Sequence, residues 1–560
     1  MSFDNDGTEL DLSFSKEIDF VATSMEEETH LEGTGSLTRN HEEMVSGSET
    51  DSNSNTYSTS IIGDNVKYGV ERVVNYSNLT SESFCFVSAL NKSIEPRTYK
   101  EAILDDNWVN AMNKEIKALN KNHTWDITEL PPGRKPIGCK WIYNIKYKAN
   151  GEIERYKAML VAKGFNQREG FGNTGNKNLV CKLNKSFYGL KQAPRKSNEK
   201  LVGILRENGF VQSCSDHSLF TKTVNNIFVA FLVYVDDIVI TGNDENKINK
   251  FKQFLSSKYQ IKDLGLLKYF LGIEVIKQGD DIYLSQRKYC LELLHDFGLL
   301  SCKPVSIPME ANTVLPFKPS HDNPYLDNIT GYQKLICKLI YLTHTRPDIS
   351  YFVHCLSQHM HSPLKSHLQS ALNVLRYLKG SPEKGLKFSH NMLSNMFEGY
   401  ADSDWAKCPK TRKSVLGYCV FYNENLISWK SKKQATLSKS STKAEYRSLG
   451  SAACEIIWIL KIMKDLKVEV NLPVSLLCDN KAVLQLVVNH VFQESSKHFK
   501  INVHFIREKN SKGIISAKKI GTLKQTADIL TKHLGVSQHN QMINKLGLFN
   551  LFTPQIMGGC

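Results

Sequence analysis

The feature that most constrains this chain is an apolar run that stops at two acids. Residues 227–235 read Ile-Phe-Val-Ala-Phe-Leu-Val-Tyr-Val, Asp236 and Asp237 follow, and the run resumes over residues 238–241 before Gly242. β-Branched and aromatic residues fill both stretches, so the pattern predicts a β-hairpin with the two aspartates at its tip. Carboxylate oxygens suit Mg²⁺, and adjacent like charges need a counter-ion or water. A solvated turn is the alternative, because aspartate is a common turn residue.

Length and cysteine usage bound the class of protein. At 560 residues the chain is too long for one core and should hold several globular units. Its 13 cysteines form no Cys-x-x-Cys pair and no Cys/His cluster at zinc spacing, which predicts reduced thiols and no zinc. The acidic start is unlike a secretion signal, and the apolar runs are too short to span a bilayer. We expect an intracellular protein, cytoplasmic or nuclear, that is not secreted and has no membrane partner.

Charge is distributed unevenly along the chain. The net charge is +14, but residues 1–60 hold 14 acidic and 2 basic side chains, so the remainder carries +26. The polar, acidic composition of the start predicts a disordered leader. The basic surplus elsewhere favours a polyanionic partner, of which nucleic acid is the first candidate.

Beyond the leader, two local patterns predict ordinary secondary structure. The apolar spacing between Tyr99 and Asn120 predicts a helix. Residues 140–146 and 159–165 predict two strands, and Asn150-Gly151 between them favours a hairpin.

Several motifs in one order resemble the reverse transcriptase of copia-type retrotransposons. They include Trp108, the run Lys-Ala-Met-Leu-Val-Ala-Lys-Gly-Phe at 157–165, Tyr-Gly-Leu-Lys-Gln-Ala-Pro-Arg at 188–195, Tyr-Val-Asp-Asp at 234–237 and Tyr-Phe-Leu-Gly at 269–272. The resemblance implies an RNA-directed DNA polymerase fold with Asp236 and Asp237 as catalytic metal ligands. It also implies that Lys191 and Arg195, in a basic stretch, contact nucleic acid; a solvated basic face is the alternative.

One part of the polymerase pattern is missing. Two-metal chemistry needs carboxylates from more than one element. The family's first catalytic aspartate lies on a strand between the Gly-Phe-x-Gln segment and the 188–195 motif, but residues 168–179 here are rich in glycine and asparagine and hold one acid, Glu169. The resemblance therefore implies an internal deletion in the palm and a lost or severely impaired polymerase. A gene assignment that omitted coding sequence is the alternative cause.

The C-terminal part contains a second set of acids. Residues 399–405 predict a strand, 418–429 a hairpin, and Ser440 the start of a helix. Residues 473–478 predict a further strand, and residues 525–532 open a predicted final helix. The acids on these elements are Asp402, Glu445, Asp479 and Asp528.

These elements resemble the ribonuclease H fold and the copia-type motifs Tyr-x-Asp, Ala-Glu-Tyr, Cys-Asp-Asn and Ala-Asp-x-Leu-Thr-Lys. Taken singly, each acid is explained by a strand end or a helix start. The resemblance implies cleavage of RNA in an RNA–DNA hybrid with Mg²⁺, or Mn²⁺ in its place. It implies that Asp402, Glu445 and Asp479 hold one ion and that Asp402 and Asp528 hold the second.

Three further lysines, Lys430, Lys432 and Lys433, follow Trp429. They are candidates for phosphate contacts, and a basic strand edge is an equally good interpretation.

The sequence thus predicts a multidomain protein of α+β and α/β class: a truncated reverse transcriptase followed by a ribonuclease H-like domain. Its predicted parts are a leader at 1–94, fingers and incomplete palm at 95–265, thumb and connection at 266–395, ribonuclease H at 396–537 and a tail at 538–560. Cleavage of RNA is the activity we expect to be retained. A non-catalytic nucleic-acid-binding remnant and a pseudogene product are the alternatives.

Overall fold

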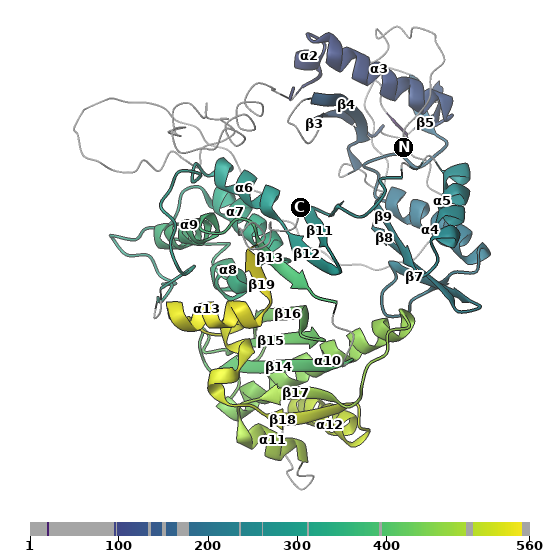
Figure 1. Cartoon of the computed structure of the whole chain (residues 1–560). Coiled ribbons are helices and arrows are strands. Elements are labelled where there is room, and N and C mark those ends of the chain that lie inside the picture. The colour runs from purple at the N-terminus through teal and green to yellow at the C-terminus, as the bar shows by residue number, and fades with distance from the viewer. Residues whose placement is uncertain are drawn as a thin grey trace, which may run out of the picture. The chain divides into compact units, whose positions relative to one another are not determined.

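The computed structural model describes residues 20–21, 95–96, 98–130, 132, 136–147, 153–164, 179–234, 237–259, 261, 263–310, 313–390, 395–488 and 497–550. The chain forms two compact units (Figure 1). Unit 1 comprises Met1–Thr59, Tyr76–Asn208 and Leu255–Lys262, and unit 2 comprises Ser60–Asn75, Gly209–Phe254 and Asp263–Cys560. Most of the predicted leader, the bridge at 165–178 and Asp236 lie outside the described residues.

The first helical stretch of unit 1 is two helices where the sequence predicted one. α2 spans Tyr99–Ala102 and α3 spans Asp106–Lys121. The break occurs because Asp105 caps α3: its side chain accepts a hydrogen bond from the backbone of Asn107 at 2.9 Å. The apolar face of α3 then buries Trp108 and Met112.

The predicted hairpin of unit 1 is confirmed. β3 (Cys139–Tyr147) and β4 (Ile153–Ala162) pair antiparallel, and the ring of Trp108 meets Tyr143 and Tyr156 edge-on, at centroid distances of 5.3 and 4.9 Å. The remaining described elements of unit 1 are β1 (Phe20–Val21), β2 (Trp125–Glu129), β5 (Leu179–Leu183) and α4 (Ala193–Glu207), with the strands in the order β1-β5-β2.

Unit 2 begins with the sheet that carries the Asp-Asp motif. β8 (Ile227–Tyr234) and β9 (Asp237–Gly242) form the predicted antiparallel hairpin, with Tyr234 opposite Asp237. β6 (Val211–Gln212) and β7 (Leu219–Val224) complete the order β6-β7-β8-β9. Helix α5 (Glu245–Lys258) follows, and its Phe251 packs against Phe210 and Phe231.

A helical layer and a second sheet follow in unit 2. The helices are α6 (Arg287–Asp296), α7 (Ile329–Leu342), η6 (Pro347–Ile349), α8 (Ser350–Ser357) and α9 (Lys365–Lys379). The sheet has the order β10-β11-β12-β13-β19, formed by Tyr269–Phe270, Ile273–Gln278, Asp281–Ser285, Lys384–Phe388 and Leu548–Asn550. Pairing of β13 with β19 thus joins segments far apart in sequence, and the predicted boundary at 537 falls inside α13 (Val536–Lys545).

The third sheet of unit 2 is mixed. Its order is β16-β15-β14-β17-β18, formed by Asn425–Lys433, Val415–Tyr422, Phe397–Asp404, Val474–Cys478 and Ile515–Lys519. β14, β15 and β16 are antiparallel, whereas β17 and β18 run parallel to β14. The predicted turn between β15 and β16 is confirmed, with Asn423 and Glu424 at φ 46° and 65°.

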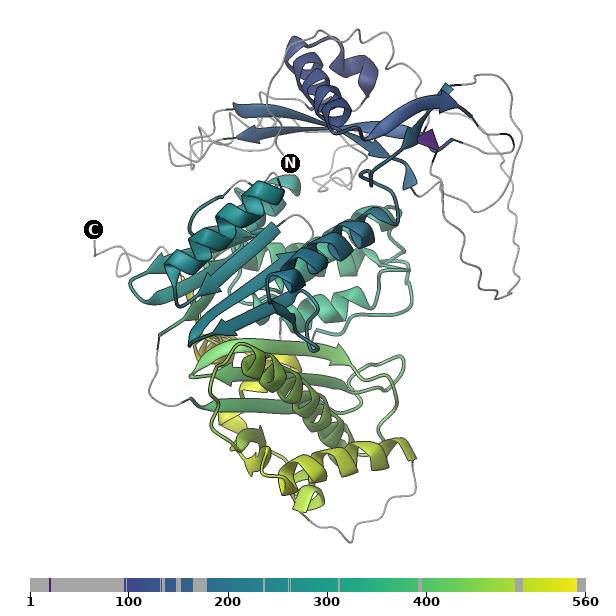
Figure 2. The same cartoon turned by 90° about the vertical axis from the view of Figure 1, so that its right-hand side faces the viewer.

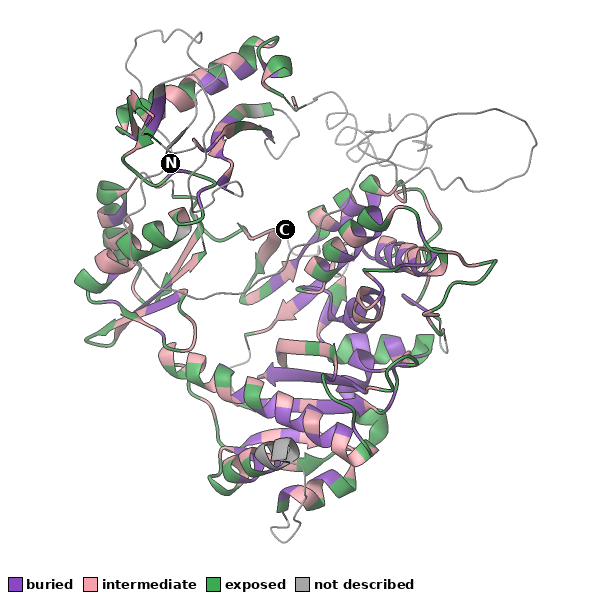
Figure 3. Cartoon of the chain, turned by 180° about the vertical axis from the view of Figure 1, so that it is seen from behind, coloured by how far each residue is buried: buried purple, intermediate pink, exposed green. Residues whose placement is uncertain are grey.

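Helix α10 (Ser441–Asp465) lies across one face of this sheet (Figure 2). α11 (Lys481–Val488) and α12 (Lys497–Ser511) complete the layer. Figure 3 shows the central strands as mostly buried, whereas α10 carries buried, intermediate and exposed residues. This arrangement confirms the predicted mixed α/β architecture with a ribonuclease H-like part.

The described cysteines and helices bear on two simpler predictions. All eleven cysteines that the structure describes are free thiols. Within the described ranges, no helix combines the length and apolar character needed to cross a membrane.

Candidate active site on the mixed sheet

The structure brings the four acids of the ribonuclease H prediction into one cluster. Asp402 lies on β14, Glu445 on α10, Asp479 directly after β17, and Asp528 on the short helix η8 (Thr526–Leu530). Asp402, Asp528 and Glu445 are 1%, 2% and 7% exposed, and Asp479 is half-buried. Buried carboxylates are rare without a partner, so this convergence points to a cation.

Strand register places Asp402 and Asp479 at the same level. β14 and β17 are parallel neighbours, with Tyr400 opposite Leu477. Each acid follows two residues later in its own segment. Because successive side chains of a strand alternate in direction, Asp402 lies on the same face of β14 as Tyr400. Asp402 is close to the carboxyl end of β14, and Asp479 directly follows the carboxyl end of the neighbouring β17.

Helix α10 presents Glu445 in its first turns, as predicted. Ser440 caps the helix by accepting a hydrogen bond from the backbone of Lys443 at 3.3 Å. One turn beyond Glu445, the hydroxyl of Ser448 lies 2.7 Å from the carbonyl oxygen of Asp402 and 3.0 Å from that of Gly417. These contacts fix the helix against the two strands that it covers.

Asp528 lies on a helix, as predicted, but this helix is short and of the 3-10 type. Residues 525–532 do not open an α-helix; η8 is a five-residue 3-10 helix, and α13 starts only at Val536. The segment packs directly onto the sheet: a Cβ added to Gly417 of β15 would come within 2.7 Å of Thr531 Cγ2 and 2.8 Å of Leu530 Cβ. The side-chain amide of Gln525 also donates to the carbonyl of Ala401 at 3.0 Å.

Two residues that the sequence prediction did not assign to the site lie beside Asp402 and Asp528. The ammonium of Lys532 is 3.3 Å from Asp402 Oδ1 and 2.7 Å from Asp528 Oδ1. The hydroxyl of Thr531 donates to Asp402 Oδ2. The spacing of Asp528 and Lys532 by four residues was the available sequence signal, because on the predicted helix such a pair would lie on one face.

Burial raises the pKa of three carboxyl groups in this cluster. Burial, together with the charges of Asp402 and Asp479, raises the pKa of Glu445 to about 9. Burial, followed by the charge of Asp402, raises the pKa of Asp528 to about 6. Burial also raises the pKa of Asp402, although Lys532 and Thr531 oppose the shift. For Lys532 burial alone would lower the pKa, but Asp402 and Asp528 outweigh it and raise the pKa.

One side of the cluster fits a divalent cation. Glu445 Oε2 is buried and has no hydrogen-bond partner among the described residues. Carboxylate oxygens of Glu445 and Asp479 and the sulfur of Cys478 lie within 4.8 Å of one another. A hard cation such as Mg²⁺ takes carboxylate oxygens, so Glu445 and Asp479 are the donors that suit it. Cys478 is a neighbour that the sequence prediction did not single out.

The Asp-Asp hairpin offers a different environment. Asp237 is exposed at the start of β9, and Asp236 lies outside the described residues. Over the described ranges, the cluster of three potential ligands at Glu445, Cys478 and Asp479 is the only one of its size, and Asp237 does not belong to it.

The predicted nucleic-acid contacts fall on both units. Lys191 and Arg195 of unit 1 are exposed, and Arg195 pairs with Glu199 at 3.0 Å. On β16, the edge strand of the mixed sheet, Lys430 and Lys432 are exposed. Lys433 is half-buried and donates to Gln358 Oε1 at 2.6 Å, which commits its ammonium to an internal contact.

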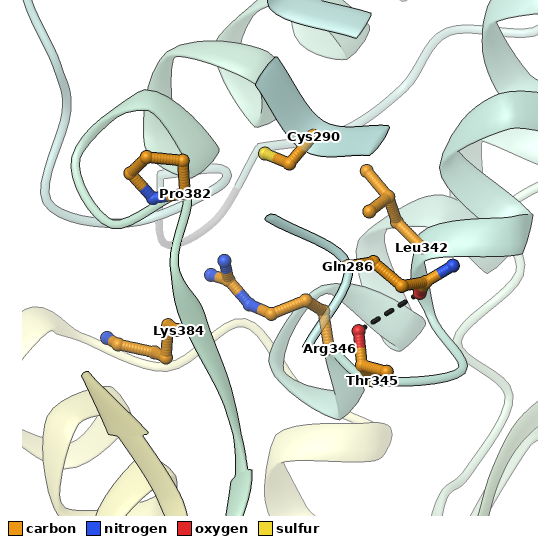
Figure 4. A pocket seen from close by; sticks show the side chains of 7 residues that line it. All are labelled: Gln286, Cys290, Leu342, Thr345, Arg346, Pro382 and Lys384. Carbon is orange, nitrogen blue, oxygen red and sulfur yellow. Dashed lines mark hydrogen bonds between the residues drawn. The ribbon is translucent and has the colours of Figure 1, made fainter. Parts of the chain in front are cut away.

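A pocket elsewhere in unit 2 has polar walls that are largely paired already (Figure 4). The guanidinium of buried Arg346 donates to both carboxylate oxygens of Asp348, at 3.0 and 2.8 Å, and to the carbonyl of Ser381 at 2.9 Å. Thr345 donates to Gln286 at 3.0 Å. We interpret this network as structural. The pocket is lined by Gln286, Cys290, Leu342, Thr345, Arg346, Pro382 and Lys384.

Comparisons with known proteins bear on the family of this chain. A family model described as reverse transcriptase (RNA-dependent DNA polymerase) matches residues 122–171 and 167–311. The retrovirus-related Pol polyprotein from transposon RE1 of Arabidopsis thaliana is 38% identical over 511 residues, covering 81% of this chain and 34% of that protein. A transposon Ty5-1 protein of Saccharomyces cerevisiae is 32% identical over 294 residues, covering 52% of this chain and 94% of that protein.

Among solved structures, the foamy viral protease-reverse transcriptase in complex with an RNA/DNA hybrid is similar with a TM-score of 0.39 and 11% identity, covering 81% of this chain and 62% of that one. The chain spans about a third of the length of the Arabidopsis polyprotein. The motifs, the mixed sheet and the two sequence relatives agree on one origin. The chain belongs to the copia-type retrotransposon Pol polyproteins and carries their reverse transcriptase and ribonuclease H-like portion.

Proposed function

We propose that this chain cleaves RNA in RNA–DNA hybrids through the ribonuclease H-like site and does not synthesise DNA. The observation that carries the proposal is the convergence of Asp402, Glu445, Asp479 and Asp528 from four separate elements into one largely buried cluster. Membership of a polyprotein family that includes this portion supports the same reaction.

Glu445 and Asp479, with Asp402 beside them, are the residues that would hold Mg²⁺, or Mn²⁺ in its place. A bound divalent cation would activate water and neutralise charge on the phosphate. The protein's own residues prepare the site: Ser440 and Ser448 fix α10, so that Glu445 stays aimed at the strand ends. Lys532 compensates the charges of Asp402 and Asp528.

The partner we propose is an RNA–DNA hybrid. Discrimination of RNA from DNA would come from contacts to 2′-hydroxyls across the shallow groove. Lys430 and Lys432, both exposed on β16, are suited to phosphate contacts. Lys191 and Arg195 remain candidates for contacts made by unit 1.

For the polymerase half we propose loss of activity. The reverse transcriptase model matches in two pieces that meet at residues 167–171, which supports a missing segment where the family has its first catalytic aspartate. Asp236 and Asp237 alone supply carboxylates from one hairpin, and two-metal transfer needs a second element.

The proposal is tested with the full chain and a labelled RNA–DNA hybrid in Mg²⁺. We expect internal cleavage of the RNA strand, no cleavage of the same RNA alone, and loss of activity in Glu445→Gln. The matched control is Glu455→Gln, ten residues further along the same helix, where the carboxylate accepts hydrogen bonds from Ser428 and Tyr418 of the neighbouring strands. A folded parent that binds the hybrid without cutting it would instead support the nucleic-acid-binding remnant.

A further inference from the structure

We propose that Lys532 supplies the second positive charge of the ribonuclease H-like site, so that the site binds one divalent cation instead of two. The inference rests on the site assigned under the proposed function. It concerns the pair Asp402 and Asp528, which the family resemblance assigned to a second Mg²⁺.

The first argument is geometric. The Lys532 ammonium lies between the two carboxylates, 3.3 Å from Asp402 Oδ1 and 2.7 Å from Asp528 Oδ1. A cation bridging these two acids would need the position that the ammonium takes. Asp402 Oδ2 is engaged as well, by the hydroxyl of Thr531. Both oxygens of Asp402 are therefore already hydrogen-bonded by the protein.

The second argument is the contrast within the cluster. On the other side, Glu445 Oε2 is buried with no partner among the described residues, and Asp479 lies within reach of it. Burying an unpaired carboxylate is costly. On the Asp528 side, the ammonium of Lys532 compensates the carboxylate charge. Among the described residues, only the Glu445 side therefore has a buried carboxylate oxygen that a cation would stabilise.

The third argument concerns how the lysine is held. Lys532 follows Asp528 by four residues, and η8 is pressed onto β15 at Gly417, where no side chain intervenes. The backbone of Lys532 donates to the carbonyl of Asp528 at 2.9 Å. Packing of η8 against β15 therefore fixes the position of the Lys532 backbone, from which the ammonium reaches Asp402 and Asp528. Lys532 is half-buried, and removing one partner of a largely buried charge pair is destabilising.

The test counts bound Mn²⁺ by the electron paramagnetic resonance signal of the free ion, using the metal-free full chain. Ions that bind elsewhere on the chain contribute equally to the parent and the variants, so they cancel when the ion counts are subtracted. Asp479→Asn is expected to lose about one tightly bound ion and Asp528→Asn none, because a single cation lies on the Glu445 side. Lys532→Met, which keeps the length but removes the charge, is expected to gain about one ion.

Two matched variants sharpen the result. Lys532→Arg retains the positive charge and should keep the parent count. Lys532→Met combined with Asp528→Asn should return to it, because the new ion needs the Asp528 carboxylate. Loss of an ion in Asp528→Asn alone, or an unchanged count in folded Lys532→Met, would overturn the proposal.

If circular dichroism shows that Lys532→Met is unfolded, Asp528→Asn decides alone: an unchanged count supports the inference and a lost ion refutes it. Ion counting is independent of cleavage. A chain that binds one ion without cutting a hybrid would contradict the proposed function and leave this inference standing.

Discussion

Asp237 is exposed at the end of a single hairpin, whereas Asp402 and Asp528 are almost completely buried in a cluster built from several elements. The hairpin motif is local: strand propensity and a turn form it whether or not other ligands exist. The cluster on the mixed sheet requires the whole fold. A motif therefore identifies ancestry, and convergence in space is the better guide to retained chemistry.

The largest expected effect is loss of hybrid cleavage in Asp479→Asn. The change keeps the size of the side chain and removes a carboxylate that, under the proposed function, would hold the cation together with Glu445. We expect cleavage by the full chain to fall at least about 100-fold, because a metal ion contributes several kcal/mol to the transition state. Cleavage is followed on a labelled hybrid.

Asp237→Asn is the matched change at the hairpin. If the two regions differ as described, it leaves the cleavage rate unaltered. A comparable loss in both variants would remove the distinction between them.

The next effect is on packing at Gly417, which brings η8 onto the sheet. Gly417→Ala would force Leu530 and Thr531 away from β15, and overpacking of this kind costs about 1–3 kcal/mol. Urea unfolding measures the stability, and cleavage should fall with it, because Asp528 and Lys532 shift.

Gly203→Ala in α4 is the control, since an added Cβ there meets nothing within 4 Å. That change should stabilise its helix by roughly 0.5–1 kcal/mol. Equal effects at both positions would contradict the close approach at Gly417.

A third prediction uses the raised pKa of Glu445. Since the folded pKa lies near 9 and the ordinary value is 4.5, the stabilising contribution is present below pH 4.5 and is lost as pH rises towards 9. Without divalent cations, unfolding free energy should fall by about 2 kcal/mol between about pH 7 and 8.5.

Mg²⁺ should flatten that slope by binding the ionised carboxylate, and Glu445→Gln should remove it. Asp237→Asn should leave it as it is. A slope that persists in Glu445→Gln would place its origin elsewhere.

The smallest expected effect concerns the exposed lysines of β16. Replacing Lys430 and Lys432 by glutamine should weaken hybrid binding modestly and reduce the dependence of log K on log salt by about 1 per lysine. Fluorescence anisotropy at several salt concentrations measures it. An unchanged slope would favour the plain basic strand edge.

Much of the fold was predictable because its signals are local. The β3–β4 and β15–β16 hairpins follow from turn residues, and the start of α10 follows from Ser440. The break between α2 and α3 was also readable, since Asp105 is a good cap. The prediction joined the two helices because it followed the apolar spacing and did not consider this cap.

The rest depended on tertiary contacts. Asp528 was predicted to lie at the start of a helix, and packing on Gly417 favours a short 3-10 helix that returns to the sheet. The position of Lys532 beside Asp402 joins residues 130 apart in sequence, which no local pattern contains. The four acids were predicted from motif order; their burial and the asymmetry between the two sides of the cluster required the structure.

The most direct test of the central claim compares two activities in one preparation of the full chain. We would measure RNA cleavage on a hybrid and DNA synthesis on a primed RNA template in Mg²⁺, for the parent, Asp479→Asn and Asp237→Asn. The account predicts cleavage by the parent and Asp237→Asn, none by Asp479→Asn, and no synthesis by any of them. Synthesis that disappears in Asp237→Asn, or cleavage that survives Asp479→Asn, would contradict it.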